Sequence, residues 1–400
     1  MTMMKYNFDE IVNTNNDIRR KWNKDIIKNI FNIEPTENFI PLWIADMDFK
    51  VPENLKSEII KFISESNMGY TFLTDDFFNC IINWYNKRKN IVLKKEWINI
   101  TYGTVGALHI LNQVFLNEND CSLILTPVYE PFKNAATDNN RNIVTSKLII
   151  KENRYYINFL DVENKIKKFH PKLFILCNPH NPSGRIWNLN ELNKIAKLCY
   201  ENDVILVSDE VHSEMIHIGK YYSSLNIDNR YINNLIVLSS PNKAFNLGGL
   251  KTSYSIIPNK LLREKFKCGM KKNSVTSPNI IGLICLVTAY NKCEDWLDEL
   301  TKYIYENYKL FSSNLEKIGL SYQKMESSYL IWVNLENTKK DGKWWTTKLK
   351  EKGILVETGY DFIENGENFI RINLGIPRKY LFKVLEIMKE ECYELTRNSK

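Results

Sequence analysis

The chain lacks several features that would assign it to other classes of protein. Its longest apolar run, around residues 280–290, is too short to cross a bilayer, and it predicts a buried helix. The opening residues contain no apolar core typical of a secretion signal. Lysine and arginine form no dense block although the formal net charge is +7, so we expect no binding to nucleic acid or to membranes.

Metal-binding patterns are also missing. The sequence has eight cysteines but no C-x-x-C pair, and His212 and His217 do not form the H-E-x-x-H pattern of a zinc site. We therefore expect no metal site. Several of the cysteines lie in apolar runs, which is typical of reduced core residues in a cytoplasmic protein.

The length and the order of patterns predict a two-domain globular protein. A chain of 400 residues is too long for one simple core. Residues 1–49 read as an arm and an entry to the small domain. Strand-like runs alternate with helical patterns over residues 50–290, which predicts a large α/β domain, and one of the expected strands covers residues 143–150. Residues 291–400 predict a smaller α+β domain that opens with a helix over 295–318.

Polar residues follow three buried strands of the predicted large domain. These strands are expected over residues 173–177, 204–207 and 235–238. Asn181, Asp209 and Lys243 follow them in that order. Continuous apolar strands are typical of a mainly parallel sheet that is covered on both faces. Ligands bind outside the carboxyl ends of the strands in such sheets, so the three side chains can converge on one ligand.

Together these three residue types suit pyridoxal 5′-phosphate (PLP). A lysine amine can form a Schiff base with an aldehyde cofactor and carry a proton. An aspartate beside the pyridine nitrogen favours the protonated ring, which is an electron sink. An asparagine amide can donate to the phenolate oxygen. Taken singly, Lys243 is a solvated loop lysine and Asp209 a helix cap, so only the combination indicates a PLP site.

A fourth segment is suited to the phosphate of the cofactor. Residues 101–115 open with a glycine-containing turn and continue as an apolar helix. The start of a helix presents free N–H groups and the positive end of its dipole to an anion. We expect Thr104 and Val105 to supply backbone N–H groups, and Ser240 and Lys251 to add a hydroxyl and a charge.

Eight motifs give the chain a resemblance to the fold-type I PLP enzymes of the class I/II aminotransferase superfamily. They are PLWIADMDF (41–49), GYT (69–71), PVYEPF (127–132), CNPHNPSGRIW (177–187), SDEVHSE (208–214), LIVLSSPNKAFNLGGL (235–250), SSYLIWVNL (327–335) and FIRINLG (369–375). More narrowly, ADMDF and CNPHNPSGR resemble the cystathionine β-lyase (C–S lyase) branch of the MalY/PatB type. The resemblance implies a large domain with a mainly parallel seven-stranded sheet and a smaller α+β domain.

The resemblance also implies roles for individual residues. Lys243 would hold the cofactor and move the Cα proton, Asp209 would pair with the pyridine nitrogen, and Asn181 would bond the ring hydroxyl. Tyr129 would stack on the ring, although it reads equally well as a core tyrosine. Tyr70 would reach the phosphate in a partner subunit, which implies a homodimer with shared active sites.

Further roles concern the substrate and the surroundings of the pyridine nitrogen. Arg371 would grip the α-carboxylate of a small amino-acid substrate, because a guanidinium fork matches a carboxylate. Asn181 and Asp46 would belong to the same substrate site. We expect His212 to help orient Asp209.

The chain departs from the common family pattern at three places. They are Asn242 and Ala244 around Lys243, the pair Gly248-Gly249, and the pair Leu374-Gly375. We expect Asn242 to hydrogen-bond the phosphate, so that the phosphate-binding site is modestly altered. We expect Gly248 and Gly249 to loosen the loop that contains them. These changes should affect substrate preference more than cofactor binding.

The implied activity is that of a PLP-dependent C–S β-lyase, which would convert cystathionine or a cysteine-type substrate to a thiol, pyruvate and ammonia. A class I/II aminotransferase would use the same residues, so residue chemistry leaves that alternative open. A ligand-sensing transcription regulator would need a DNA-binding segment, for which residues 1–49 are too short. A catalytically silent scaffold would not be expected to keep Lys243, Asp209, Asn181 and Arg371 together.

Overall fold

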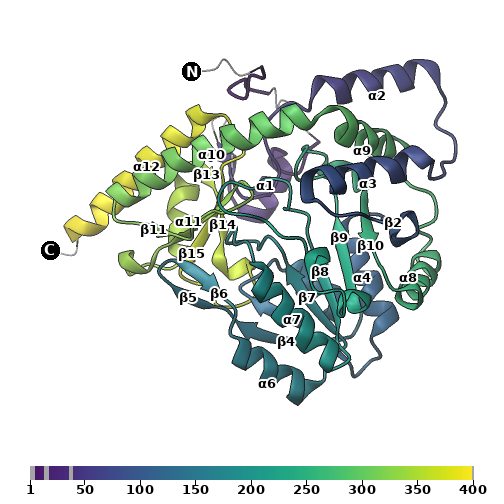
Figure 1. The fold of residues 1–400 in the computed structure, drawn as a ribbon. Coiled ribbons are helices and arrows are strands. Elements are labelled where there is room, and N and C mark those ends of the chain that lie inside the picture. The colour runs from purple at the N-terminus through teal and green to yellow at the C-terminus, as the bar shows by residue number, and fades with distance from the viewer. Residues whose placement is uncertain (1–4, 13–17, 36–38, 399–400) are drawn as a thin grey trace.

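The computed structural model describes residues 5–12, 18–35 and 39–398. Its larger part is built on one seven-stranded sheet with the order β2-β10-β9-β8-β7-β3-β4 (Figure 1). The strands are β2 (Ile98–Thr101), β3 (Cys121–Thr126), β4 (Asn142–Lys147), β7 (Leu173–Cys177), β8 (Ile205–Asp209), β9 (Leu235–Ser239) and β10 (Ser253–Ile256). Only β10 runs antiparallel to its neighbours. The predicted α/β fold with a mainly parallel sheet is confirmed.

Helices cover the strands of this sheet. They are α2 (Glu53–Glu65), α3 (Asp75–Lys89), α4 (Thr104–Phe115), α5 (Pro131–Thr137), α6 (Phe159–Phe169), α7 (Leu189–Glu201), α8 (Lys260–Lys272) and α9 (Ile280–Lys292). Helix α4 packs on β2, β9 and β10, while α6 packs on β3 and β4 and α7 on β8. Every residue of β3, β7 and β9 is buried, because these runs are apolar on both faces.

One predicted strand was wrong. The expected strand over residues 143–150 is divided between β4 and β5 (Ile149–Lys151), and β5 pairs antiparallel with β6 (Arg154–Tyr156) as a separate hairpin. The break falls at Leu148, whose side chain is buried and whose N–H donates to the carbonyl of Thr126, whereas the side chains of β5 are exposed.

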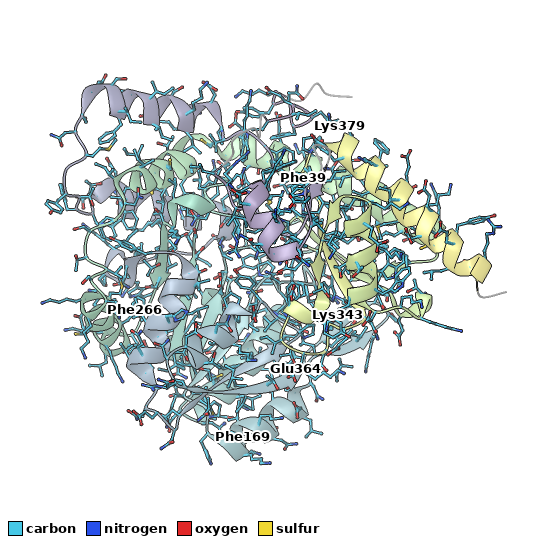
Figure 2. The ribbon with its side chains drawn as sticks, turned by 180° about the vertical axis from the view of Figure 1, so that it is seen from behind. Phe39, Phe169, Phe266, Lys343, Glu364 and Lys379 are labelled. Atoms are coloured by element: carbon cyan, nitrogen blue, oxygen red, sulfur yellow. The ribbon has the colours of Figure 1, made fainter. Side chains whose placement is uncertain are left out.

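A second, four-stranded sheet has the order β11-β12-β15-β14 and is antiparallel throughout. Its strands are β11 (Ser321–Tyr322), β12 (Leu330–Asn334), β14 (Glu357–Thr358) and β15 (Phe369–Asn373), and its helices are α10 (Glu294–Lys317), α11 (Gly342–Glu351) and α12 (Arg378–Asn398). Helices α10 and α12 lie side by side (Figure 1). Figure 2 shows Lys343 of α11 and Lys379 of α12 on the side of the molecule that holds this second sheet, and Phe266 of α8 on the opposite side.

The N-terminal segment contributes a strand to a separate two-stranded sheet. Strand β1 (Ile40–Pro41) pairs parallel with β13 (Ile354–Leu355), and α1 (Lys24–Phe31) lies close to Phe39 (Figure 2). Parts of the predicted arm, residues 1–4, 13–17 and 36–38, lie outside the described residues. The boundaries at residues 49 and 290 stay predictions.

The topology brings several strand ends to one edge of the large sheet. Strands β7, β8 and β9 are parallel, and β2 runs in the same direction because β10 is antiparallel to both β2 and β9. Their carboxyl ends therefore meet at one edge. Asp209 ends β8 at this edge, and the turns that lead to Asn181, Lys243 and Thr104 begin there.

The described residues contain no disulfide, no membrane-spanning helix and no cluster of metal ligands. All eight cysteines are free, and six of them are buried. Within the ranges given above, no helix is long and apolar enough to cross a membrane, and no group of three or more His, Cys, Asp or Glu side chains could hold a metal ion.

Candidate active site

Lys243 lies in the turn that follows β9, and its Nζ donates a 2.7 Å hydrogen bond to the backbone carbonyl of Ala45. Burial lowers the pKa of Lys243, and the charge of Arg371 lowers it further, while three nearby carboxylates oppose this effect. The amine is therefore closer to its neutral form than an exposed lysine would be. A neutral amine is the form that acts as a nucleophile or a base.

The carbonyl of Ala45 is shared between two side chains. The hydroxyl of Tyr329, at the start of β12, donates to the same oxygen at 2.7 Å. Both donors are held where the chain of residues 41–49 crosses between the two sheets. This segment therefore positions Lys243 through its main chain.

Asp209 is the last residue of β8, and its side chain is only 4% exposed. Its Oδ1 accepts a 3.1 Å hydrogen bond from the backbone N–H of Val211. Burial raises the pKa of Asp209 to about 7, and a hydrogen bond with the Thr104 hydroxyl opposes this shift. In the described part of the chain, Asp209 has no ion pair within 4.0 Å, so its carboxylate is suited to a cationic N–H partner.

Arg371 lies on β15 and is 2% exposed. Its Nη1 donates to Oδ1 of Asn181 at 3.1 Å, and its Nη2 donates to the carbonyl of Trp43 at 2.9 Å. Nη2 also forms an ion pair with Glu357 on the adjacent strand β14. The buried Nε has no hydrogen-bond partner among the described residues, so the fork retains a donor for an incoming oxygen.

Asn181 is thus placed beside Arg371. It is buried in the turn after β7, and its backbone N–H points to the Cys177 sulfur at 3.3 Å. Tyr129, half-buried just beyond β3, is near enough to feel the charges of both Arg371 and Asp209. The structure therefore brings together the predicted residues Lys243, Asp209, Asn181, Tyr129 and Arg371.

Asp46 is half-buried close to Lys243, whose pKa its carboxylate raises. A Cβ atom at position 248 would lie 3.1 Å from Oδ1 of Asp46, so Gly248 allows a close approach at this point. Likewise, a Cβ atom on Gly375 would lie 2.6 Å from Cγ of Met47. Two of the departures noted in the sequence therefore let the 41–49 segment pack tightly. That the glycine pair loosens its loop stays a prediction.

His212 lies in the site but has a different partner from the predicted one. Its Nδ1 pairs with the Ser328 hydroxyl at 3.2 Å, and its ring centroid lies 6.3 Å from that of Tyr329. Among the described residues, the recorded hydrogen bonds include none between His212 and Asp209. Burial lowers the pKa of His212 to about 3, so the ring is neutral near pH 7.

The candidate phosphate seat is formed by the first turn of α4 and the turn before Lys243. Gly103 precedes Thr104 with φ of +78°, which glycine adopts easily, and no side chain caps the helix start at Thr104 and Val105. The Ser240 hydroxyl donates to the carbonyl of Thr252 at 2.8 Å and accepts from the N–H of Asn242 at 3.0 Å.

Two predicted phosphate ligands differ in their surroundings. Asn242 is buried, and its Nδ2 amide is the group that could donate to a phosphate, because Oδ1, which has no hydrogen-bond partner among the described residues, can only accept. Lys251 is exposed at the end of a short 3-10 turn, with φ of +48°. The roles of both in binding a phosphate stay predictions.

Tyr70 is not brought to these residues within the chain. It lies between α2 and α3, and its side chain is fully exposed. A side chain with no packing contact in its own subunit cannot line that subunit's site.

Comparisons with known proteins identify the family. Residues 37–387 match the profile of the family described as "Aminotransferase class I and II". The chain belongs to this family. It is 33% identical to "Cystathionine beta-lyase PatB" of Bacillus subtilis (strain 168), over 84% of this chain and 88% of that protein.

Two solved structures are similar over nearly the whole chain. Cystalysin from Treponema denticola, which contains PLP, is 30% identical with a TM-score of 0.92, covering 99% of this chain and 100% of that one. The PLP-bound C–S lyase from Staphylococcus hominis is 30% identical with a TM-score of 0.89, covering 97% and 98%. The chain is therefore a PLP-dependent enzyme of the class I/II aminotransferase superfamily, and PLP is its cofactor.

The residues at the site fit this cofactor. Asp209 is a buried carboxylate without an ion pair, which matches a protonated pyridine nitrogen. The start of α4, which no side chain caps, leaves backbone N–H groups that can donate to a phosphate. Lys243 supplies a buried amine between them. Binding of PLP accounts for all of these groups.

Sequence reasoning missed three members of the site: Tyr329, Glu357 and the carbonyl of Ala45. Tyr329 lies in the SSYLIWVNL motif and Glu357 in the apolar run GILVE, but both read as ordinary residues of short strands. The sequence gives no signal for Glu357, because its place directly opposite Arg371 depends on the antiparallel pairing of β14 with β15. A backbone carbonyl leaves no signal in a sequence.

Proposed function

We propose that the enzyme is a C–S β-lyase that acts on cystathionine or a cysteine-type amino acid. The substrate and one water molecule would give a thiol, pyruvate and ammonia. The observation that carries this choice is the 33% identity with "Cystathionine beta-lyase PatB" over 84% of the chain. The likeness to the C–S lyase of Staphylococcus hominis supports the same choice.

Arg371 would bind the α-carboxylate of the substrate. The guanidinium is fixed by Asn181 and by the carbonyl of Trp43, and its Nε keeps an unused donor. Because the fork is already ordered, little side-chain freedom is lost when a carboxylate binds. The substrate would then lie between Arg371 and Lys243.

Lys243 would act as the base at Cα. Its buried amine, with a lowered pKa, can accept the Cα proton. The electrons of the C–H bond then form a double bond to Cβ, and those of the C–S bond leave with the sulfur. The hydrogen bonds from Lys243 and Tyr329 to the Ala45 carbonyl would keep the amine on the correct side of the substrate.

PLP, when bound, supplies the electron sink that stabilises negative charge at Cα. Asp209 would hold the pyridine nitrogen in its protonated form, and Tyr129 would pack on the ring. Asn242, Ser240, Thr104 and Val105 would surround the phosphate.

Release of pyruvate tests this proposal. Purified enzyme supplied with PLP and cystathionine should release pyruvate and a thiol in equal amounts, steadily and without any added keto acid. A turnover that requires a keto-acid acceptor would instead favour an aminotransferase, the alternative that the family as a whole supports.

We also propose that the enzyme is a homodimer with shared active sites. Met68, Tyr70 and Phe72 are exposed on the segment between α2 and α3. Beside them, Leu73 and Phe78 help line a groove of about 630 Å³. An exposed apolar segment next to a groove suits a two-fold interface, in which each copy covers the other.

A further inference from the structure

We infer that Glu357 selects substrates by charge: its carboxylate, held beside Arg371, disfavours amino acids with a negatively charged side chain relative to neutral ones. This inference rests on the proposed function only in taking Arg371 as the seat of the α-carboxylate. It holds for elimination and for transamination alike.

Strand pairing in the second, four-stranded sheet fixes the position of Glu357. Glu357 on β14 is the direct cross-strand partner of Arg371 on β15, and the two side chains form an ion pair. The Glu357 side chain is 22% exposed and that of Arg371 is 3% exposed. Arg371 also donates to Oδ1 of Asn181 and to the carbonyl of Trp43. Because these hydrogen bonds fix the guanidinium, the Glu357 carboxylate stays beside it.

Glu357 also lies within electrostatic range of the reacting centre. Its charge raises the pKa of Lys243 and that of Tyr129. The α-carboxylate of an amino acid bound by Arg371 would therefore lie beside Glu357, and its side chain would lie within the field of the Glu357 carboxylate. Charges in such a partly enclosed site are screened much less than charges on an open surface.

The balance of charge around Arg371 is negative once a substrate is bound. The single positive charge of Arg371 would then face two carboxylates, that of Glu357 and the α-carboxylate. Glu130 and Asp361 add negative charge near Glu357, and Lys243 adds positive charge. Arg20, which lies over the ring of Trp43, is exposed like Glu130 and Asp361, so solvent screens the charges of all three. A second substrate carboxylate would meet net repulsion.

Binding of two matched compounds tests the inference. α-Methylaspartate and α-methylasparagine have nearly the same shape, differ by one charge, and carry no Cα hydrogen, so neither can react further. Their dissociation constants would be measured by calorimetry at pH 8 on the PLP-loaded wild-type enzyme and on Glu357→Gln. Glu201→Gln, which removes an exposed carboxylate on α7 outside the site, is the control.

The wild-type enzyme should bind α-methylaspartate at least about tenfold more weakly than α-methylasparagine, which corresponds to about 1.4 kcal/mol. In Glu357→Gln this ratio should fall below about threefold, and in Glu201→Gln it should stay near the wild-type value. An unchanged ratio in Glu357→Gln would overturn the inference. An equal gain in affinity for both compounds would also overturn the inference, because Glu357 would then only weaken the attraction of Arg371 for the α-carboxylate.

The pH dependence supplies a readout that a purely structural role would not change. Burial raises the pKa of Glu357 to about 7; Arg371 and Lys243 oppose this shift, and Asp361 and Glu130 add to it. The wild-type ratio should therefore shrink at pH 6, while the ratio for Glu357→Gln should be the same at pH 6 and pH 8. Since no turnover is measured, a negative result here is distinct from a failure to release pyruvate.

Discussion

Lys243 is buried, and among the described residues its amine donates one hydrogen bond, to a backbone carbonyl. The amine is therefore available for chemistry. Asp209 is likewise buried, and within the described ranges it forms no ion pair within 4.0 Å. Most buried charges in proteins are paired, so unpaired ones mark functional positions. The residue scale therefore gives the most direct tests of the site.

Replacing Lys243 with alanine should lower turnover by at least about three orders of magnitude, because it removes both a covalent anchor and a base. Borohydride should fix PLP to the wild-type chain at Lys243 and leave the variant unlabelled, as mass spectrometry of peptides would show. Lys220→Ala, at an exposed lysine, is the control and should behave as wild type. Near-normal turnover of Lys243→Ala would contradict the assignment.

Asp209 should make the stability of the PLP-free protein depend on pH. Its pKa is about 7 in the folded protein, against an ordinary value of 3.8, so the folded form holds the proton more tightly. This contribution is fully present below about pH 4 and is lost as the pH rises towards 7, with a slope of up to about 1.4 kcal/mol per pH unit. Asp209→Asn should lack this part of the slope in urea unfolding measured from pH 5 to pH 8.

Asp228→Asn is a suitable control for this experiment. The pKa of Asp228 is lowered to about 2 by its hydrogen bonds with Arg230, so it does not titrate in the same window. If wild type and Asp209→Asn showed parallel pH profiles without PLP, Asp209 would not hold its proton in the fold.

At the scale of elements, the N-terminal segment is tied to the site by one buried ion pair. Nζ of Lys21 lies 2.8 Å from Oδ2 of Asp48, and it also donates to the carbonyl of Asp46. Trp22 donates to the other oxygen of Asp48 at 2.7 Å. These contacts hold the segment whose Ala45 carbonyl accepts from Lys243.

Lys21→Met should therefore destabilise the protein by about 3–5 kcal/mol, because Asp48 would remain buried without its cation. Removing the exposed Lys167 from its pair with Glu163 is the matched control and should cost less than about 0.5 kcal/mol. Urea unfolding measures both. A loss in Lys21→Met as small as that of the control would show that the pair does not anchor the segment.

The strands that position the site could be predicted from their apolar runs alone. The expected strand over residues 173–177 coincides with β7, and the expected helix over 295–318 differs from α10 by one residue at each end. The division of residues 143–150 into β4 and β5 could not be predicted, because the apolar pattern continues across Leu148. Tertiary pairing with β6, rather than propensity, ends the strand there.

The convergence of Lys243, Asp209 and Asn181 followed from the rule for parallel sheets, and the addition of Arg371 and Tyr129 from the family resemblance. The partner of His212 was missed, because Ser328 lies 116 residues away on the other side of a domain connection. Such long-range contacts depend on how two sheets face each other. A single sequence holds little information on that arrangement.

At the scale of the whole molecule, shared active sites can be tested with mixed subunits. Lys243→Ala and Tyr70→Ala should each be strongly impaired alone. If Tyr70 acts in the partner's site, a mixed dimer has one site with both changes and one intact site. An equal mixture, after subunit exchange, should regain roughly a quarter of wild-type turnover, since random pairing makes half of the dimers mixed.

Sedimentation velocity on the same samples would establish the dimer, and Tyr200→Ala, at an exposed tyrosine on α7, is the control for loss of a surface ring. Recovery should be absent when Lys243→Ala is mixed with a second inactive variant of the same site, such as Asp209→Ala. If the mixture of Lys243→Ala and Tyr70→Ala stayed inactive although mixed dimers formed, each site would be complete within one chain.

The oxygen that orients both Lys243 and Tyr329 belongs to the peptide bond between residues 45 and 46. No codon change at position 45 can delete it, so selection can vary that side chain while the acceptor persists. Alanine scanning would overlook it for the same reason. Only chemistry on the main chain reaches it: a semisynthetic protein with an ester in place of that amide would carry a poorer acceptor while every side chain stayed intact.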